Sequence, residues 1–129
     1  MFENWQQPEL KHNELTRWNW TCSNPAHLKI GSQVDIGCFC YLNAHQGIIL
    51  EDLVQIGSHC ALISISTIDG KMGEIHIKRN AKIGTHSTIM PGITIGENAV
   101  VGAHSFVNKS VPDNEMWWGV PASFRKFVK

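Results

Sequence analysis

The chain has 129 residues, in which 11 basic and 11 acidic side chains cancel to a formal net charge of zero at pH 7. This length suits one domain with a hydrophobic core of its own. The sequence contains no basic run and no basic patch interleaved with aromatic residues, which argues against nucleic acid or an anionic membrane surface as a partner. The expected partners are small molecules.

No apolar run approaches the roughly 20 residues that a membrane span requires, and the first residues lack the charged-then-apolar pattern of a signal peptide. We therefore expect a cytoplasmic protein without a membrane span. All four cysteines are expected to be free thiols. Cys40 and Cys60 fall at small inward positions of a repeat, and the two-residue spacing of Cys38 and Cys40 lacks the turn that a metal-binding pair uses.

Residues 1–27 carry no repeat and are expected to cap the rest of the chain. The segment from Pro8 to Trp18 predicts a short helix with Leu10 and Leu15 on the same side as Trp18. Three tryptophans provide bulky apolar cover for a first coil: Trp5, Trp18 and Trp20. A cap is needed because the end coil of a repeat protein exposes its core. The alternative is an aromatic platform that binds an acceptor molecule.

A repeat of six residues dominates the second half of the chain. Aliphatic residues return at every sixth position: Ile77, Ile83, Ile89, Ile95, Val101 and Val107. The position four residues after each aliphatic is mostly small: Ala81, Ser87, Ile93, Ala99 and Ser105. This period indicates a short strand and a tight turn, and three such sides close a coil of about 18 residues. The pattern predicts an all-β solenoid, because an all-β sandwich would not keep both positions in register over five repeats.

The repeat begins at Ile30 and is interrupted twice. Leu42 and Leu50 are eight residues apart instead of six, and a turn-rich loop at 64–76 precedes Ile77. The sequence therefore predicts a cap at 1–27, a β-helix at 28–110 with the loop 64–76 inserted, and a tail at 111–129.

The interruptions mark the corner at which function is expected. Counting sides in threes places four aliphatic residues on one face: Leu42, Leu62, Ile83 and Val101. His45, His86 and His104 would then share the corner that follows this face, together with both interruptions. His59 would lie at another corner, near Phe39.

The segments Ile83 to Val107, Lys109-Ser-Val-Pro and Gly119-Val-Pro-Ala give the chain, from about residue 28 onward, a resemblance to the hexapeptide-repeat acyltransferases. That family includes galactoside, maltose and serine acetyltransferases. The resemblance implies a left-handed parallel β-helix, a homotrimer, acetyl-CoA or another acyl-CoA as co-substrate, and acyl transfer to a hydroxyl or amine at a cleft between two subunits. No metal is expected.

The loop from Ser66 to Gly73 is similar to a narrower branch, the bacterial enzymes that acylate sugars or nucleotide-linked amino sugars for lipopolysaccharide and other surface polysaccharides. The sugar-hydroxyl acetyltransferases carry a catalytic histidine where this loop begins, and the segment 64–69 has none.

Acyl transfer needs a base for the acceptor and a hydrogen-bond donor for the thioester oxygen. His45 is the first candidate for the base, because it lies at an interrupted corner. The expected acceptor-binding residues are Asn43, His59, Ser64, Ser66 and Asp69. Three alternatives remain open: His45 is only an exposed turn residue, His59 is the base, or a neutral sugar amine reacts without a protein base while Asp69 or Glu74 holds it.

The resemblance also implies residues for the cofactor. Small residues at the coil edge would let the pantetheine arm approach the backbone: Gly84, Gly102 and Ala103. Residues toward the carboxyl end would lie near the adenine and its phosphates: Lys109, Gly119, Pro121, Arg125 and Lys126. Trp117 and Trp118 would pack on the last coil or stack on the adenine.

A function of a different class is a non-catalytic β-helix scaffold or a relative of the carbonic anhydrases built on this fold. The latter would hold zinc between subunits, with ligands drawn from His59, His76, His86 and His104. The Gly119-Val-Pro-Ala segment favours the transferase.

Overall fold

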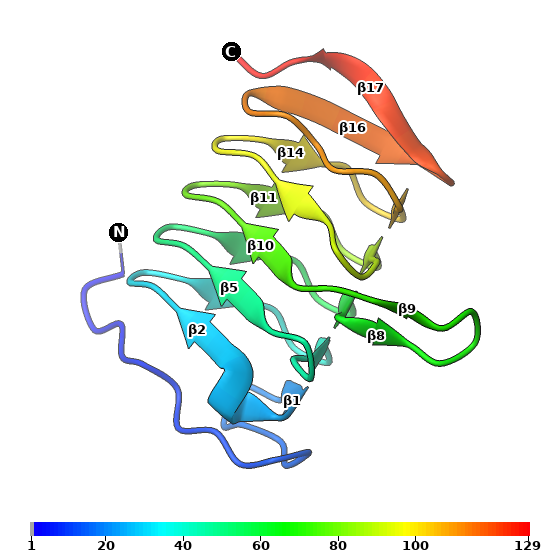
Figure 1. Ribbon diagram of the computed structural model, residues 1–129. Helices are drawn as coiled ribbons and strands as arrows, with labels where there is room; N and C mark the ends of the chain where they lie inside the picture. Colours follow the sequence, from blue (N-terminus) through cyan, green and yellow to red (C-terminus); the bar gives the residue numbers. More distant parts are fainter. Residues whose placement is uncertain (1) are drawn as a thin grey trace.

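A computed structural model describes residues 2–129. Three sheets form the sides of a solenoid, and successive turns of the chain add short parallel strands to them (Figure 1). Sheet A contains β1 (Thr21–Ser23), β4 (Tyr41–Asn43), β7 (Ala61–Ile63), β12 (Thr88–Ile89) and β15 (Phe106–Val107). Sheet B contains β2 (Leu28–Ile30), β5 (Ile48–Leu50), β10 (Ile75–Ile77) and β13 (Thr94–Ile95).

Sheet C contains β3 (Asp35–Ile36), β6 (Gln55–Ile56), β11 (Lys82–Ile83), β14 (Val100–Val101), β16 (Glu115–Gly119) and β17 (Ala122–Phe127). Two further elements lie between sheets A and B: the 3-10 turn η1 (Pro25–His27) and the hairpin of β8 (Ile65–Ser66) and β9 (Lys71–Met72). The prediction of an all-β parallel helix is confirmed.

Aliphatic residues at the sixth positions form columns inside the solenoid. In sheet A, the register aligns Leu42 with Leu62, then Leu62 with Ile89, and Ile89 with Val107. All four are at most 1% exposed. Full burial of such a side chain contributes about 2 kcal/mol of transfer free energy, so the columns supply the driving force that strands of two or three residues could not provide alone.

The three sheets meet at three corners, which we name by their residues. The histidine corner, between sheets C and A, carries Phe39, His59, His86 and His104. The loop corner, between sheets A and B, carries residues 44–47 and 64–74. The asparagine corner, between sheets B and C, carries Asn80, Asn98 and Asn114, whose side-chain amides bond in series at 2.8 and 3.2 Å.

The predicted distribution of histidines over these corners is partly wrong. Leu42 and Leu62 share sheet A, so both interruptions lie at the loop corner, as predicted. Ile83 and Val101, however, lie in sheet C and not in sheet A. The loop after Leu62 occupies one corner and returns the chain to sheet B, where Ile77 aligns with Leu50. His86 and His104 therefore lie with His59 at the histidine corner, away from His45.

The predicted helix at 8–18 is also wrong, because residues 2–20 form turns without a helix. Backbone donors of this segment bond to the first coil and to a local turn instead: Asn13 N to Cys22 O at 2.9 Å, and Thr16 N to Trp20 O at 2.9 Å. Trp20 is buried, whereas Leu15 is 62% exposed. The coil register begins with β1, which pairs with β4 and lies within the predicted cap at 1–27.

The carboxyl-terminal tail at 111–129 forms two strands. Strand β16 adds to β14 in parallel, and β17 turns back antiparallel to β16 at the end of sheet C. All four cysteines are free, as predicted, and Cys38 is the exposed one. Burial raises the pKa of Cys22 to about 11. Residues 2–129 include no helix of the length and apolar character that crossing a membrane takes.

Candidate active site

His45 lies exposed at the loop corner, in the two-residue excess between β4 and β5. Its backbone N–H donates to Asn43 Oδ1 at 3.1 Å. Its ring Nδ1 lies 3.2 Å from Asn24 Nδ2, and its backbone O lies 3.0 Å from His27 Nδ1. These contacts anchor both the backbone and the ring nitrogen Nδ1. The other ring nitrogen, Nε2, is therefore the one that can contact a substrate molecule.

A serine connects the two interruptions. Ser64 is fully buried, and its hydroxyl oxygen accepts a hydrogen bond from Gln46 N at 2.8 Å. Its backbone N–H donates to Asn43 O at 3.0 Å. The structure therefore brings Asn43, His45 and Ser64 together, with Ser64 supporting the corner from inside.

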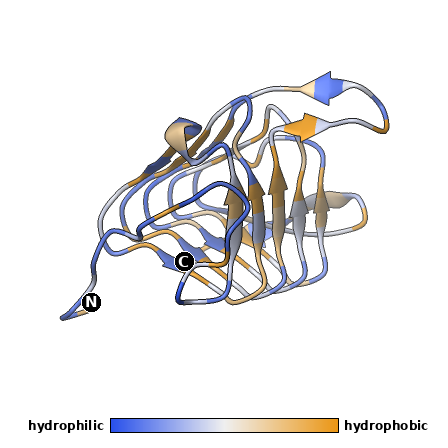
Figure 2. Ribbon diagram, turned by 90° about the horizontal axis from the view of Figure 1, so that it is seen from below, coloured by the Kyte–Doolittle hydropathy of each residue, from blue (hydrophilic) through white to orange (hydrophobic). Residues whose placement is uncertain are grey.

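Ser66 and Asp69 lie on the β8–β9 hairpin, which projects away from the solenoid (Figures 1 and 2). The Ser66 hydroxyl and the Lys71 backbone N–H hold the pKa of Asp69 below its ordinary value. Asp69 thus remains a carboxylate at neutral pH. At the tip, Ile68 is 98% exposed, so the hairpin presents an apolar side chain to whatever lies opposite it.

Sequence reasoning missed four residues at this corner: Asn24, His27, Tyr41 and His12. Tyr41 OH lies 3.3 Å from Asn43 Nδ2 and 3.3 Å from Ser23 Oγ. His12 Nδ1 accepts a hydrogen bond from Asn24 N at 3.0 Å. Three of the four precede the first repeat at Ile30, so the repeat pattern carried no signal that would have found them.

The histidine corner holds an aromatic ladder. Ring centroids are 5.3 Å apart for Phe39 and His59, 4.6 Å for His59 and His86, and 4.9 Å for His86 and His104. All four residues have φ between 57° and 61°, a left-handed conformation in which histidine and asparagine are enriched. His59 is therefore near Phe39, as predicted, and the structure separates it from the other expected acceptor-binding residues.

The predicted pantetheine-binding residues lie beside this ladder. Gly84, Gly102 and Ala103 line a groove over sheet C. A Cβ atom on Gly84 would lie 2.4 Å from Ala103 N, and one on Gly102 would lie 2.8 Å from Trp118 Cβ. Coil packing therefore requires both glycines, whatever the groove binds.

The predicted adenine-side residues fall into two groups. Gly119 and Pro121 form the turn between β16 and β17, and Arg125 donates from Nε to Trp118 O at 3.1 Å with its guanidinium 5.4 Å from the Trp118 ring centroid. Lys126 is exposed on β17. Lys109 follows β15 and lies across sheet A from this turn, so the structure does not bring it to the others within one chain.

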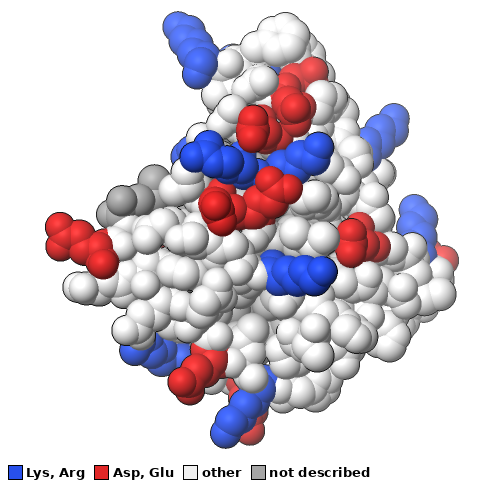
Figure 3. Space-filling view, turned by 60° about the vertical axis from the view of Figure 1, so that its left-hand side comes forward, with Lys and Arg blue, Asp and Glu red and all other residues white. Residues whose placement is uncertain are grey.

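Residues 2–129 hold no group of three or more His, Cys, Asp or Glu side chains arranged for a metal ion. His76 contacts the Glu51 carboxylate on sheet B, apart from the ladder. On the face shown in Figure 3, acidic and basic side chains lie among one another.

Comparison with known proteins shows which proteins share this repeat. Residues 74–109 match the family model described as bacterial transferase hexapeptide (six repeats). Galactoside O-acetyltransferase of Escherichia coli K12 is 34% identical over an alignment 112 residues long, which covers 75% of this chain and 55% of that protein. Residues 74–109 therefore carry the hexapeptide repeats of this transferase family, and the chain is similar to acetyltransferases that contain them. It spans about half the length of the curated galactoside O-acetyltransferases that it matches.

Solved structures of the family support the left-handed parallel β-helix. A hexapeptide-repeat acetyltransferase from Vibrio cholerae, complexed with acetyl coenzyme A, has a TM-score of 0.81 at 27% identity and covers 85% of this chain and 65% of its own. A second similar structure is that of AntD, an N-acyltransferase from Bacillus cereus, complexed with dTDP-4-amino-4,6-dideoxyglucose and coenzyme A. Its TM-score is 0.74 at 27% identity, and the match covers 89% of this chain and 80% of AntD.

The loop corner and the glycine-lined groove lie at opposite edges of sheet A. One side of the solenoid, from corner to corner, is on the order of 15 Å wide at about 3.3 Å per residue. A proton acceptor and a thioester must come within about 3.5 Å of the reacting hydroxyl or amine. Within one chain, His45 and a cofactor in the groove therefore do not meet.

Proposed function

We propose that this protein is an acyltransferase that moves an acetyl group from acetyl-CoA to a hydroxyl or amino group of a sugar or nucleotide-linked amino sugar. Its place would be the cytoplasmic synthesis of bacterial surface polysaccharides such as lipopolysaccharide. The similarity to a galactoside O-acetyltransferase and to AntD supports the sugar acceptor. The observation that carries the proposal is the pairing of an anchored histidine at the loop corner with a glycine-lined groove one side away.

The arrangement of corners supports a homotrimer in which the loop corner of one subunit faces the histidine corner of the next. A closed ring of identical subunits repeats the same two-sided contact three times. The projecting hairpin, with exposed Ile68 at its tip, is suited to reach the neighbouring chain. Asn43 and Asp69 from one subunit would then bind the acceptor against a cofactor held by the other.

The proposed mechanism uses direct attack. His45 Nε2 takes the proton of the acceptor as its oxygen or nitrogen forms a bond to the thioester carbonyl carbon. The carbon–sulfur bond then breaks, and the coenzyme A thiolate receives the proton that His45 holds. Backbone N–H groups along the groove are placed to donate to the carbonyl oxygen as it gains negative charge.

The Asn24 amide decides whether His45 has the required tautomer. If the Asn24 nitrogen donates to Nδ1, a neutral ring carries its proton on Nε2 and acts only as a donor there. A base requires the side-chain oxygen of Asn24 to accept from Nδ1–H, leaving Nε2 free. Asn24→Asp, which offers only oxygens, should preserve at least the wild-type kcat, because it enforces the base tautomer. A large loss of kcat in Asn24→Asp would instead make His45 a hydrogen-bond donor.

The decisive experiment is subunit complementation. Thiol release from acetyl-CoA is measured with a panel of galactosides, maltose and nucleotide amino sugars. His45→Ala removes the loop-corner base, and Ala103→Trp fills the groove; each variant alone should be inactive. In co-expressed mixtures, about a quarter of the sites should combine an intact His45 with an intact groove, because subunits of a closed oligomer mix at random. Mixtures that stay inactive would contradict the intersubunit site.

The competing function, a scaffold without catalysis, makes an opposite prediction. A scaffold would release no thiol with any acceptor and would not bind coenzyme A. Stoichiometric zinc in the purified protein would favour the carbonic-anhydrase alternative. Release that survives His45→Ala, with His59→Ala as the companion variant, would transfer the base role to His59 or remove it from the protein altogether.

A further inference from the structure

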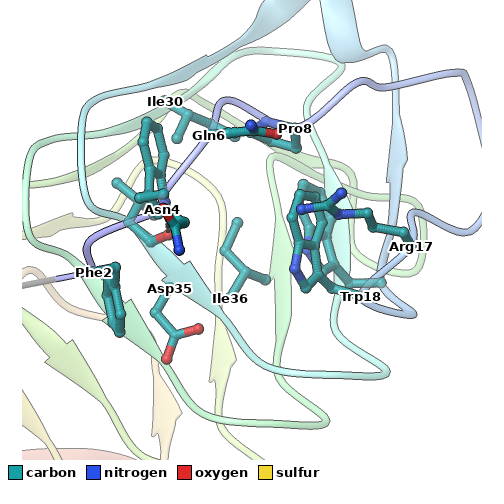
Figure 4. Close-up of a pocket in the computed structure, with 12 residues that line it drawn as sticks. Phe2, Asn4, Gln6, Pro8, Arg17, Trp18, Ile30, Asp35 and Ile36 are labelled. Atoms are coloured by element: carbon teal, nitrogen blue, oxygen red, sulfur yellow. Dashed lines mark hydrogen bonds between the residues drawn. The ribbon is translucent and has the colours of Figure 1, made fainter.

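A cavity of about 230 Å³ lies between the amino-terminal segment and the first coil (Figure 4). Two side chains fasten this segment to the coil: Trp5 Nε1 donates to Val34 O at 2.7 Å, and Gln7 Nε2 donates to Ile30 O at 2.8 Å. The segment thereby bridges strands β2 and β3 without filling the space beneath it. Neither the loop corner nor the aromatic ladder contributes to its walls.

Aromatic rings form much of the wall. Trp20 is buried at 2% exposure, whereas Phe2 and Trp18 are 38% and 39% exposed. The Arg17 guanidinium lies 4.4 Å from the Trp18 ring centroid, which holds the indole in place. Rigid rings of this kind supply a large contact area at low cost in conformational entropy.

Three polar side chains border the same cavity without a hydrogen-bond partner elsewhere in residues 2–129: Asn4, Gln6 and Asp35. Their sequence neighbours Trp5 and Gln7 are, by contrast, bonded to the backbone of the coil. An apolar pocket with a few convergent polar groups is the usual design of a small-molecule site. The free amides and carboxylate offer both donors and acceptors to a ligand.

The charge of the wall selects the class of ligand. The positive charge of Arg17 and the negative charge of Asp35 cancel, and the Arg17 guanidinium already lies over Trp18. The wall therefore has no free positive charge to neutralise a diphosphate. The volume lies below the 300–1,000 Å³ of typical drug-sized sites, which restricts the ligand to about one ring. We propose that the cavity is a second saccharide site that binds one neutral pyranose, with its apolar face on Trp18 and its hydroxyls on Asn4, Gln6 and Asp35.

This site goes beyond the proposed transferase, and its test needs no acyl donor. The full chain is titrated with methyl α-glucoside, methyl β-galactoside and maltose, and the five tryptophan indole N–H signals are followed by NMR. We expect saturable shifts of the Trp18 and Trp20 signals with at least one of these sugars. Trp18→Ala should weaken that binding about tenfold, as loss of an aromatic anchor at a binding surface does.

Trp118→Ala is the matched control, because Trp118 is also 39% exposed and also carries an arginine over its ring, at the other end of the solenoid. It should leave sugar binding unchanged. Gln6→Ala, an exposed position that does not threaten folding, should weaken binding a few fold.

Three results would overturn the saccharide site. The first is the absence of shifts with every sugar. The second is equal binding of cyclohexylmethanol, which would make the cavity merely apolar. The third is tighter binding of thymidine monophosphate, which would make it a nucleotide site.

Discussion

The histidine corner and the loop corner bound the same sheet, yet they are built differently. Four successive coils turn the histidine corner with the same number of residues and a left-handed residue at the same place. At the loop corner the first three coils differ: η1 after β1, four residues after β4, and a hairpin after β7. The regular corner is fixed by backbone packing between coils, whereas the irregular corner leaves side chains such as His45 exposed.

His45 provides the largest test of this difference. Removing a general base slows catalysis about 10²- to 10⁴-fold, so His45→Ala should lower kcat by at least about 100-fold. His86→Ala, at the regular corner, should change kcat by less than about tenfold, because a ladder ring orients the cofactor at most. Steady-state thiol release measures both variants. Equal losses would erase the proposed division of roles between the corners.

Two glycines test the packing difference. Gly84→Ala places a Cβ atom 2.4 Å from the Ala103 backbone, and such overpacking should lower the free energy of unfolding by about 3 kcal/mol. Gly70, in the hairpin, has φ +71° and open space around it, so Gly70→Ala should cost only about 1 kcal/mol of backbone strain. Urea denaturation followed by circular dichroism measures both. A Gly70 variant as unstable as the Gly84 variant would show that the hairpin is packed as tightly as the coils.

The ladder positions give a smaller effect. His86 has φ +59°, so His86→Ala should cost about 1 kcal/mol of left-handed strain. His86→Asn should cost less, because asparagine tolerates this conformation and occupies the equivalent place at the asparagine corner. Thermal unfolding of the two variants checks the order. If asparagine destabilises more than alanine, the backbone conformation does not explain the histidines.

The smallest predicted effect is a titration at the hairpin. Since the Ser66 hydroxyl is the largest cause of the lowered pKa of Asp69, Ser66→Ala should raise that pKa toward its ordinary value. A lowered carboxyl pKa stabilises the folded hairpin above the unfolded pKa, and this contribution disappears as the pH falls through the folded value. NMR titration of the Asp69 carboxyl carbon below about pH 5 measures it. An unchanged midpoint in Ser66→Ala would leave the Lys71 contact as the cause.

The burial of the sixth-position aliphatic residues was predictable, because it depends on the local repeat of six residues. The aliphatic period predicted that Leu62 and Ile89 are interior residues, since a six-residue side always returns its first residue to the interior. It did not predict that they share a column, because it grouped Leu62 with Ile83. The failed helix at 8–18 shows the opposite case. Its apolar spacing is compatible with a helix, but its backbone donors find stronger partners in the first coil, such as Cys22 O.

By itself, the sequence determined the solenoid and the two places where the repeat fails, because burial of a regular aliphatic column leaves the backbone little choice. Only the tertiary structure decided which histidines share a corner. The loop after Leu62 forms its own antiparallel hairpin, and its length does not reveal how many sides it replaces. Pairing of Ile75 with Ile48 resolves that count, and it separates His45 from the ladder of His59, His86 and His104.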